Sequence, residues 1–497
     1  MKKTFIYISA FIAVTSAVSC SKDFLALDPQ STIPATNFYK TEADINQAVT
    51  ACYSPVRDLT NVDYWLYGEM RSDNSFFQYN NANRGLETQR EYVDEFLVSA
   101  TSETVQEMWT LSYKSISNCN DVLAHIDDAN ISSDATKNQF VGEVEFLRAY
   151  NYFILVQQFG GVPLRLTSVT SPADAPSTGR ASVDDVYKQI VADLTDAITK
   201  LPVSYDAGQK GRATKGAAET VLANVYMVQK NWDGAITALR DVMNLGYSLL
   251  PDYRSIWDPA NKNNAESIFE IQYLGSQSGL SSSFMYTFVP FTSGSNITGD
   301  AGTGLGVGSG WNIPTQDMLD AYETGDKRKD ASLTVGFTDE TGAFVNMPYV
   351  TKYNWGFTSP GQTNVDFILY RYADVLLMLA EALNEKGYNV GEPFSLINEV
   401  RKRAGLKDLT AVDVPSQSAF RDTVAHERRV ELAFENHRWY DLVRTGKAVS
   451  VMNANGVYQK AHYSFYPAAS YNVTENKLLL PLPQREITID KLEQNPQ

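Results

Sequence analysis

Side chains that support catalysis are present in this chain, but their spacing matches no familiar catalytic arrangement. His426 and His437 fall on a predicted helix and are not one turn apart, so they do not form the paired face of a zinc protease. The segment Gly275–Gly279 resembles a nucleophile elbow, but Gln277 stands where a nucleophile is needed. His125 and His462 are isolated, which indicates structural histidines. We therefore predict no enzyme, no cofactor and no resident metal.

Acidic residues are abundant, with 58 Asp and Glu in the chain. Hydrolysis of a glycosidic bond needs only two carboxyl groups across the bond, so a surface glycosidase remains an alternative. Helix caps and charge pairs account for most acids in an acidic helical protein. The abundance of carboxylates therefore indicates architecture rather than an active site.

Charged residues crowd the segment Glu427–Arg444. Their spacing predicts contacts on a helix surface for the pairs Arg428–Glu431, Glu435–Arg438 and Arg438–Asp441. A complementary apolar stripe consists of Ala425, Leu432, Trp439 and Val443. The sequence therefore predicts one docking helix with partly buried ion pairs, which is architecture and not a reactive centre.

The cysteine with the clearest predicted chemistry is Cys20. Lys2 and Lys3 precede an apolar stretch from Phe5 to Val18, and small residues lead into the cysteine. This pattern predicts a signal peptide over 1–19 and lipidation of Cys20, with a lipidated tether over 20–40. An ordinary cleaved signal followed by a chance cysteine is the alternative. No later apolar run is long enough to cross a bilayer, so we expect membrane attachment through the lipid alone.

The composition narrows the classes of partner. The net charge of −16 without a basic cluster excludes nucleic acid as an expected partner, because such a surface repels phosphate backbones. The 28 tyrosines offer rings that suit stacking on sugars, although most are expected in the core. Cys52 and Cys119 remain after Cys20 is used, and the sequence does not decide whether they pair.

Apolar residues recur with helical periodicity in the first half of the chain, which predicts the helices that position the candidate residues. Thr41 and Ser182 predict helix starts. Ala223 and Ala235 have the interval of a tetratricopeptide repeat, although Glu219 replaces the expected tryptophan. A second helix pair is predicted over Tyr372–Ala404. We predict a mainly all-α fold with a tetratricopeptide-like helical-repeat scaffold.

The middle of the chain has a different character. Ser, Gly, Thr, Asn and aromatic residues replace helical periodicity, which is typical of a segment that carries function. We predict a single domain over 41–497, with a scaffold over 41–274 and 367–446. A loop-rich insertion over 275–366 and a C-terminal tail over 447–497 complete it, and the tail is expected to be loop-like from Tyr463.

Five blocks of the chain carry a family resemblance: Cys20–Leu25, Phe146–Tyr150 with Gly160–Leu164, Tyr370–Leu377, His426–Glu435 with His437–Leu442, and Leu480–Pro483. In this order, they resemble the SusD/RagB family of nutrient-binding outer-membrane lipoproteins. Segment Ser21–Asp23 also resembles the surface-export signal of Bacteroidetes lipoproteins. The resemblance implies a SusD-like helical fold, an outer-membrane location facing the exterior, and a SusC-like TonB-dependent transporter as partner. It also implies capture of a glycan without cleavage.

A sugar site requires exposed aromatic rings beside amide and charged groups. Two segments meet this requirement, one over Glu69–Tyr79 and one within the insertion. We predict Arg71 and Asn74 as hydroxyl partners and Phe77, Tyr79 and Trp311 as stacking rings, with Tyr286, Tyr353 and Trp355 as further ligand contacts. A packing role in a loop is the alternative for each ring, and a structural ion pair is the alternative for Arg71 and Asp73.

A peptide-binding import lipoprotein, RagB-like, is the main alternative, since some relatives in this family take up peptides and helical repeats offer surfaces to peptides. The aromatic and asparagine-rich segments favour a sugar over a peptide. Neither the glycan nor its linkage follows from the sequence.

Overall fold

The computed structural model describes residues 38–82, 84–169, 179–277, 279–301 and 308–496. The predicted signal peptide, Cys20 and most of the 20–40 tether lie outside these residues. Within them, no helix combines the length and apolarity needed to cross a membrane.

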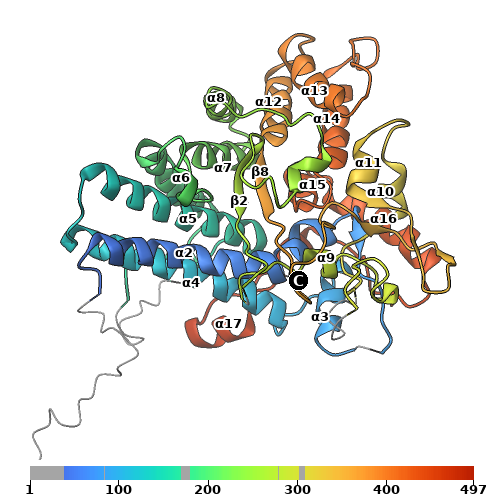
Figure 1. Cartoon of the computed structure of the whole chain (residues 1–497), viewed down its shortest axis with the longest axis horizontal. Helices are drawn as coiled ribbons and strands as arrows, with labels where there is room; N and C mark the ends of the chain where they lie inside the picture. Colours follow the sequence, from blue (N-terminus) through green and yellow to red (C-terminus); the bar gives the residue numbers. More distant parts are fainter. Residues whose placement is uncertain (1–37, 83, 170–178, 278, 302–307, 497) are drawn as a thin grey trace, which may run out of the picture.

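Long helices form one side of the molecule, where α2 (Glu42–Val62), α4 (Glu103–His125) and α5 (Asp134–Phe159) lie side by side (Figure 1). A capping box at Thr41 starts α2, as its sequence predicts. Gly160, with φ of 71°, ends α5 in a conformation that glycine adopts without strain. Cys52 on α2 and Cys119 on α4 are buried with free thiols.

Consecutive helices continue this packing through α6 (Val183–Lys200), α7 (Lys215–Val228) and α8 (Trp232–Met243). Ser182 caps α6, as predicted. The small residues Ala223 and Ala235 are fully buried where α7 and α8 approach each other. The mainly helical fold is confirmed, whereas the tetratricopeptide-like repeat stays a prediction.

The second half of the scaffold joins the first without a break. Helix α12 (Tyr372–Lys386) packs against α8, and α13 (Glu392–Arg403) packs against α12. This helix pair confirms the one predicted over Tyr372–Ala404. Before α12, strand β8 (Phe367–Arg371) pairs antiparallel with β2 (Ser267–Ile271), so the two ends of the irregular insertion lie side by side.

The insertion consists of short elements separated by turns. They are α9 (Phe284–Thr287), β3 (Ile313–Pro314), α10 (Gln316–Asp320), α11 (Arg328–Ser332), β4 (Leu333–Thr334), β5 (Phe337–Thr338), β6 (Phe344–Val345) and β7 (Tyr349–Val350). Strand β4 pairs with β7, and β5 pairs with β6. The insertion therefore lacks the long helices of the scaffold.

The single docking helix predicted over Glu427–Arg444 is wrong. The chain forms α14 (Gln417–Glu431) and α15 (Arg438–Arg444), separated by a turn. Phe434 and Asn436 in this turn have positive φ values of 66° and 68°, which a helix cannot accommodate. The carboxylate of Glu69 accepts hydrogen bonds from the backbone N–H groups of both residues, at 2.9 and 3.1 Å, and so stabilises the turn.

The tail is more ordered than the sequence indicates. Helix α16 (Ala448–His462) follows α15, and α17 (Gln484–Asp490) lies near the C-terminus. Figure 1 shows α16 on the same side of the molecule as α10 and α11. Gly456 lets α16 approach the chain at Tyr471, because a Cβ atom at Gly456 would lie 2.2 Å from the Cβ of Tyr471.

Candidate functional site

The two segments proposed from the sequence come together in the structure. Strand β1 (Ser75–Phe76) pairs antiparallel with β3, which places Phe76 opposite Ile313. The backbone N–H of Gln78 donates to the carbonyl of Gly310 at 2.8 Å. Gly310 permits this approach, since its φ is 73° and a Cβ there would lie 2.5 Å from Gln78 Oε1. The segment that contains Tyr79 therefore runs beside the segment that contains Trp311.

Five of the predicted site residues are buried rather than exposed, which contradicts their assignment as ligand contacts. Their exposed fractions range from 1% to 5%: Arg71, Asn74, Phe77, Tyr286 and Tyr353. A side chain with so little exposed surface offers a ligand neither a ring face nor a free hydrogen-bonding group. The alternative role in packing applies to these five residues.

Structural contacts account for the polar members of this buried group. Arg71 lies over the rings of Trp439 and Phe96, and burial lowers its pKa to about 10. Asn74 donates to Glu69 at 2.8 Å and accepts from Arg429 at 2.8 Å. Asp73 pairs with Arg438 and Arg429, so the predicted ion-pair alternative was right for Asp73 but named the wrong arginine.

The two buried tyrosines are fixed through their hydroxyl groups. Tyr286 donates to Asp300 at 2.9 Å, and Tyr353 donates to the carbonyl of Phe434 at 2.9 Å. The Tyr353 ring also stacks on Phe367 with centroids 5.6 Å apart. Tyr353 therefore joins the insertion to the rest of the fold, whereas Tyr286 is fixed to another residue of the insertion.

The other three predicted rings are half-buried, and an arginine guanidinium lies over the face of each one. Arg84 lies over Tyr79, Arg90 over Trp311 and Arg254 over Trp355, with guanidinium-to-centroid distances of 4.7, 4.3 and 4.3 Å. Trp311 also stacks on the buried Trp65 at 5.5 Å. Arg254 belongs to the 3₁₀ turn η6 (Arg254–Trp257), so Trp355 packs in a separate environment from the other two rings.

The tail contributes aromatic residues that the sequence did not nominate. Phe465 stacks on Tyr79 with centroids 4.5 Å apart and planes 13° apart, and Tyr463 lies 5.5 Å from Phe465. Both tail rings are half-buried. Asn80 and the exposed Asn81 follow Tyr79 in the chain. The tail was expected to be loop-like, and only the density of aromatic residues over 463–466 signalled this role.

Buried carboxylates lie beneath this surface, at the end of α3 (Leu86–Asp94). Asp94 accepts from the Phe77 backbone at 3.1 Å and from Tyr471 at 2.9 Å, and Glu95 accepts from Ser470 at 2.6 Å. Burial raises the pKa of Asp94 well above its usual range and that of Glu95 to about 7. Glu91, on the same helix, pairs with Arg84.

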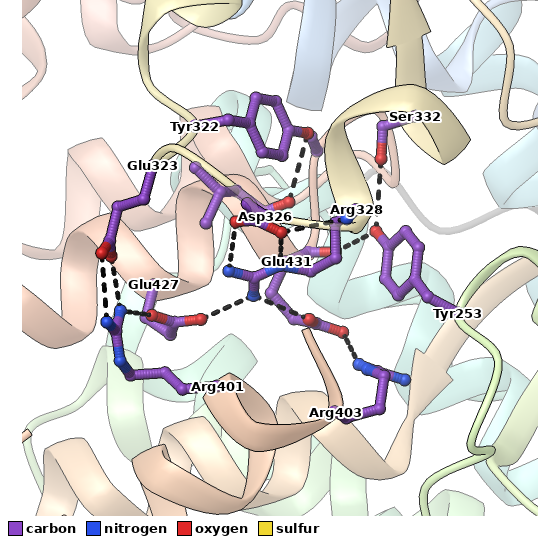
Figure 2. A network of polar contacts seen from close by, with 12 residues as sticks. Tyr253, Tyr322, Glu323, Asp326, Arg328, Ser332, Arg401, Arg403, Glu427 and Glu431 are labelled. Carbon is purple, nitrogen blue, oxygen red and sulfur yellow. Dashed lines mark hydrogen bonds and ion pairs between the residues drawn. The ribbon is translucent and has the colours of Figure 1, made fainter. Parts of the chain in front are cut away.

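A second polar cluster lies in the interior and joins α11 of the insertion to α13 and α14 of the scaffold (Figure 2). Arg328 pairs with Asp326, Glu427 and Glu431, and all four side chains are at most 1% exposed. Arg401 and Arg403 extend the cluster from α13 to Glu427 and Glu431. These carboxylates face arginines and not a cavity, so the cluster is structural.

The same cluster continues to the start of α12. Arg371 pairs with Glu266, Glu431 and Glu435, and Lys352 pairs with Glu435. The surface pairs predicted along one helix are therefore replaced by contacts between distant segments. Arg428, for example, pairs with Asp374 at 2.6 Å and with Asp441 at 2.9 Å. Among the described residues, no group of three or more His, Cys, Asp or Glu side chains is arranged to hold a metal ion.

Two family models match separate parts of this chain. The model described as "SusD family" matches residues 330–497, and the model described as "Starch-binding associating with outer membrane" matches residues 23–227. SusD-like protein P25 from Formosa agariphila is 27% identical, over 96% of this chain and 95% of its own length. A SusD-like protein from Bacteroides ovatus is 25% identical, over 87% of this chain and 81% of its own length.

Solved structures that are similar to this chain also include SusD-like proteins. A laminarin-binding SusD-like protein is similar with a TM-score of 0.75 and 27% identity, covering 92% of this chain and all of that one. Surface glycan-binding protein A from Bacteroides thetaiotaomicron shares the fold, with a TM-score of 0.76 and 22% identity, over 93% of this chain and all of its own. Sequence and fold agree over nearly the whole described chain, and this protein belongs to the SusD/RagB family.

Proposed function

We propose that this protein captures a glycan at the cell surface, without cleaving it, and delivers it to a SusC-like TonB-dependent transporter. The observation that carries the proposal is the stacked pair Tyr79 and Phe465 beside the exposed amide of Asn81. Ring faces bind the C–H faces of sugars, and amides bind hydroxyl groups. The laminarin-binding relative makes a neutral β-glucan the first ligand class to test.

Arg84 has a defined role in this proposal. It lies over the Tyr79 ring, while its charge is held by Glu91. Arg84 is exposed, so a sugar can displace its guanidinium from the ring while the arginine keeps its carboxylate partner. Arg84→Ala is therefore expected to keep or increase glycan affinity, whereas Tyr79→Ala removes the ring itself.

Native gels cast with laminarin, other neutral glucans and acidic polysaccharides test this role on the mature chain. We expect one neutral glycan to retard the wild type, and Tyr79→Ala or Phe465→Ala to reduce the retardation. Tyr388→Ala is the matched control, since Tyr388 is an exposed tyrosine on the loop between α12 and α13. Equal retardation of all variants would place the site elsewhere on the molecule.

The same experiment separates the alternatives. If no glycan retards the wild type, peptide import becomes the better explanation, and the aromatic surface has a packing role. If the polysaccharide becomes shorter during incubation, the protein is a glycosidase and the non-catalytic role is overturned. Retardation with unchanged polymer length supports capture alone.

Delivery and location form a separate part of the proposal. We infer that Cys20 is acylated and holds the protein on the outer face of the outer membrane, which agrees with the "associating with outer membrane" description of the matching model. Cys20→Ser is expected to release the protein from the membrane fraction. Co-purification of a β-barrel transporter with the wild-type lipoprotein tests the partnership.

A further inference from the structure

The C-terminal end of α16 presents exposed apolar and aromatic groups that the proposed site does not use. Val457 is 70% exposed and Tyr458 is 39% exposed. His462 is also exposed, and its ring stacks on Tyr458 with centroids 3.9 Å apart and planes 22° apart. The sequence indicated an isolated structural histidine at 462, but the structure places it at the surface on a tyrosine ring.

The contacts of His462 define which of its ring nitrogens carries a proton in the neutral side chain. Nδ1 lies 2.8 Å from the backbone carbonyl of Tyr458. A carbonyl oxygen only accepts hydrogen bonds, so Nδ1 carries the proton and donates it. In the neutral imidazole, Nε2 is then a hydrogen-bond acceptor. The pair therefore combines a tyrosine ring with one acceptor, which suits a sugar ring and a hydroxyl group.

The chain leads directly from Tyr458 and His462 to the rings of the proposed site. Tyr463 directly follows His462, and its ring lies 5.5 Å from that of Phe465, which stacks on Tyr79. Tyr463 also lies 5.6 Å from Phe76. A line of aromatic rings, which we call the aromatic ridge (Tyr458, His462, Tyr463, Phe465 and Tyr79), runs from α16 to the loop after β1.

The ridge is fixed in place by polar contacts of α16. Asn453 exchanges hydrogen bonds with the backbone of Val473, at 2.9 and 3.0 Å. Lys460 donates to the carbonyl of Ser470 at 3.0 Å. Together with the close approach at Gly456, these contacts hold α16 against the segment that follows the ridge. A ligand would meet a preformed surface, which reduces the entropy cost of binding.

We propose that Tyr458 and His462 form a second contact point for the same glycan chain, beyond the sugar units held at Tyr79 and Phe465. This inference rests on the proposed function. A glycan is the occupant because the ridge is continuous with the proposed site and combines ring faces with one acceptor. Its ring-bearing residues include no carboxylate, and the charge of Lys460 is directed to a backbone carbonyl.

Chain length provides the test. Isothermal titration would compare laminarin-derived oligosaccharides, from disaccharide to polymer, on the wild-type mature chain, Tyr458→Ala and His462→Phe. For long chains, Tyr458→Ala is expected to weaken binding about three- to tenfold, the range that corresponds to one aromatic contact. His462→Phe keeps the ring and removes the Nε2 acceptor, so a smaller loss is expected. Short chains are expected to bind all three proteins equally.

Two outcomes would overturn the inference alone. Tyr458→Ala could leave the affinity for every chain length unchanged, or it could weaken short and long chains equally. Tyr79→Ala serves as the reference, because it is expected to weaken all lengths. Failure of the wild type to bind any glycan would instead overturn the proposed function and the inference that depends on it.

Discussion

The buried charged cluster, which joins the insertion to the scaffold, and the aromatic ridge on the surface have different roles in the fold. In the cluster, Arg328 and Arg371 each contact several carboxylates, and all of these side chains are excluded from water. In the ridge, rings such as Tyr79 and Tyr458 keep exposed surface and contact one another or an arginine. The first region fixes the geometry of distant segments, and the second leaves surface for a ligand.

The carboxylates of the two regions also differ in ionisation. Burial alone would raise the pKa of Glu431, but Arg403, Arg371 and Arg328 lower it below its usual range. Beneath the ridge, burial raises the pKa of Glu95 to about 7, and Glu91 adds to the shift. Arginine partners therefore keep Glu431 ionised at neutral pH, whereas the pKa of Glu95 lies close to neutral pH.

The largest expected effect is the loss of a central arginine. Arg371→Met leaves the carboxylates of Glu266, Glu431 and Glu435 buried without this partner, and we expect the free energy of unfolding to fall by about 3–5 kcal/mol. Urea unfolding measures the change. Arg240→Met is the control, since its pair with Glu392 is exposed and worth at most about 1 kcal/mol. Similar losses in both variants would remove the distinction between buried and exposed ion pairs.

A smaller effect is expected where the ridge is attached. Gly456→Ala introduces a methyl group that would lie 2.2 Å from the Cβ of Tyr471, so α16 must move away. Overpacking of this kind costs about 1–3 kcal/mol. Thermal unfolding measures the loss, and binding of long oligosaccharides should weaken as Tyr458 shifts. Wild-type stability in this variant would show that the contact at Gly456 does not position α16.

The pH dependence of stability separates the two regions further. The pKa of Glu95 is raised to about 7 in the folded protein, above its value near 4.5 in the unfolded chain. The folded state therefore binds more protons between these values, and stability falls as the pH rises from about 4.5 to 7.

Glu95→Gln should remove this part of the pH dependence, about 1–2 kcal/mol after allowance for solvent screening. Denaturant unfolding at several pH values measures it. A Glu431 titration cannot produce the same slope, because its pKa is lowered and its contribution to stability is lost progressively as the pH falls below about 4.5. An unchanged slope in Glu95→Gln would assign the neutral-range dependence to other groups.

The smallest effect on stability is expected at the exposed end of the ridge. Tyr458→Ala removes a ring that is 39% exposed, so the free energy of unfolding should change by about 0.5 kcal/mol or less. Thermal unfolding checks this value before any binding data are compared. A loss of more than about 2 kcal/mol would show that Tyr458 belongs to the packed core rather than to a binding surface.

Local sequence signals were sufficient for much of the scaffold. Thr41 and Ser182 cap helices where predicted, because a cap depends on hydrogen bonds to the next few residues. The helix pair over Tyr372–Ala404 and the irregular insertion were also correct. The break between α14 and α15 could not be predicted, since the turn at Phe434 depends on Glu69, which is far away in the sequence.

The candidate site was predicted at the level of segments but not of side chains. The Glu69–Tyr79 segment and the Trp311 segment do adjoin, yet Phe77 and Tyr353 are buried while Tyr79 and Trp311 keep exposed surface. The residue type alone does not distinguish these rings, because each of them is able to stack on a ligand. Whether a ring is covered depends on residues that the fold brings to it, such as Phe367 on Tyr353.

The sequence by itself determined the family, the mainly helical scaffold, the presence of an irregular insertion and the absence of familiar catalytic spacings. These properties follow from short-range periodicity, caps and motif order. The tertiary structure alone decided which charges are buried and which aromatic rings face solvent, because both depend on contacts between remote segments. Phe465 reaches Tyr79 from nearly the opposite end of the chain, and no local pattern around either residue specifies that contact.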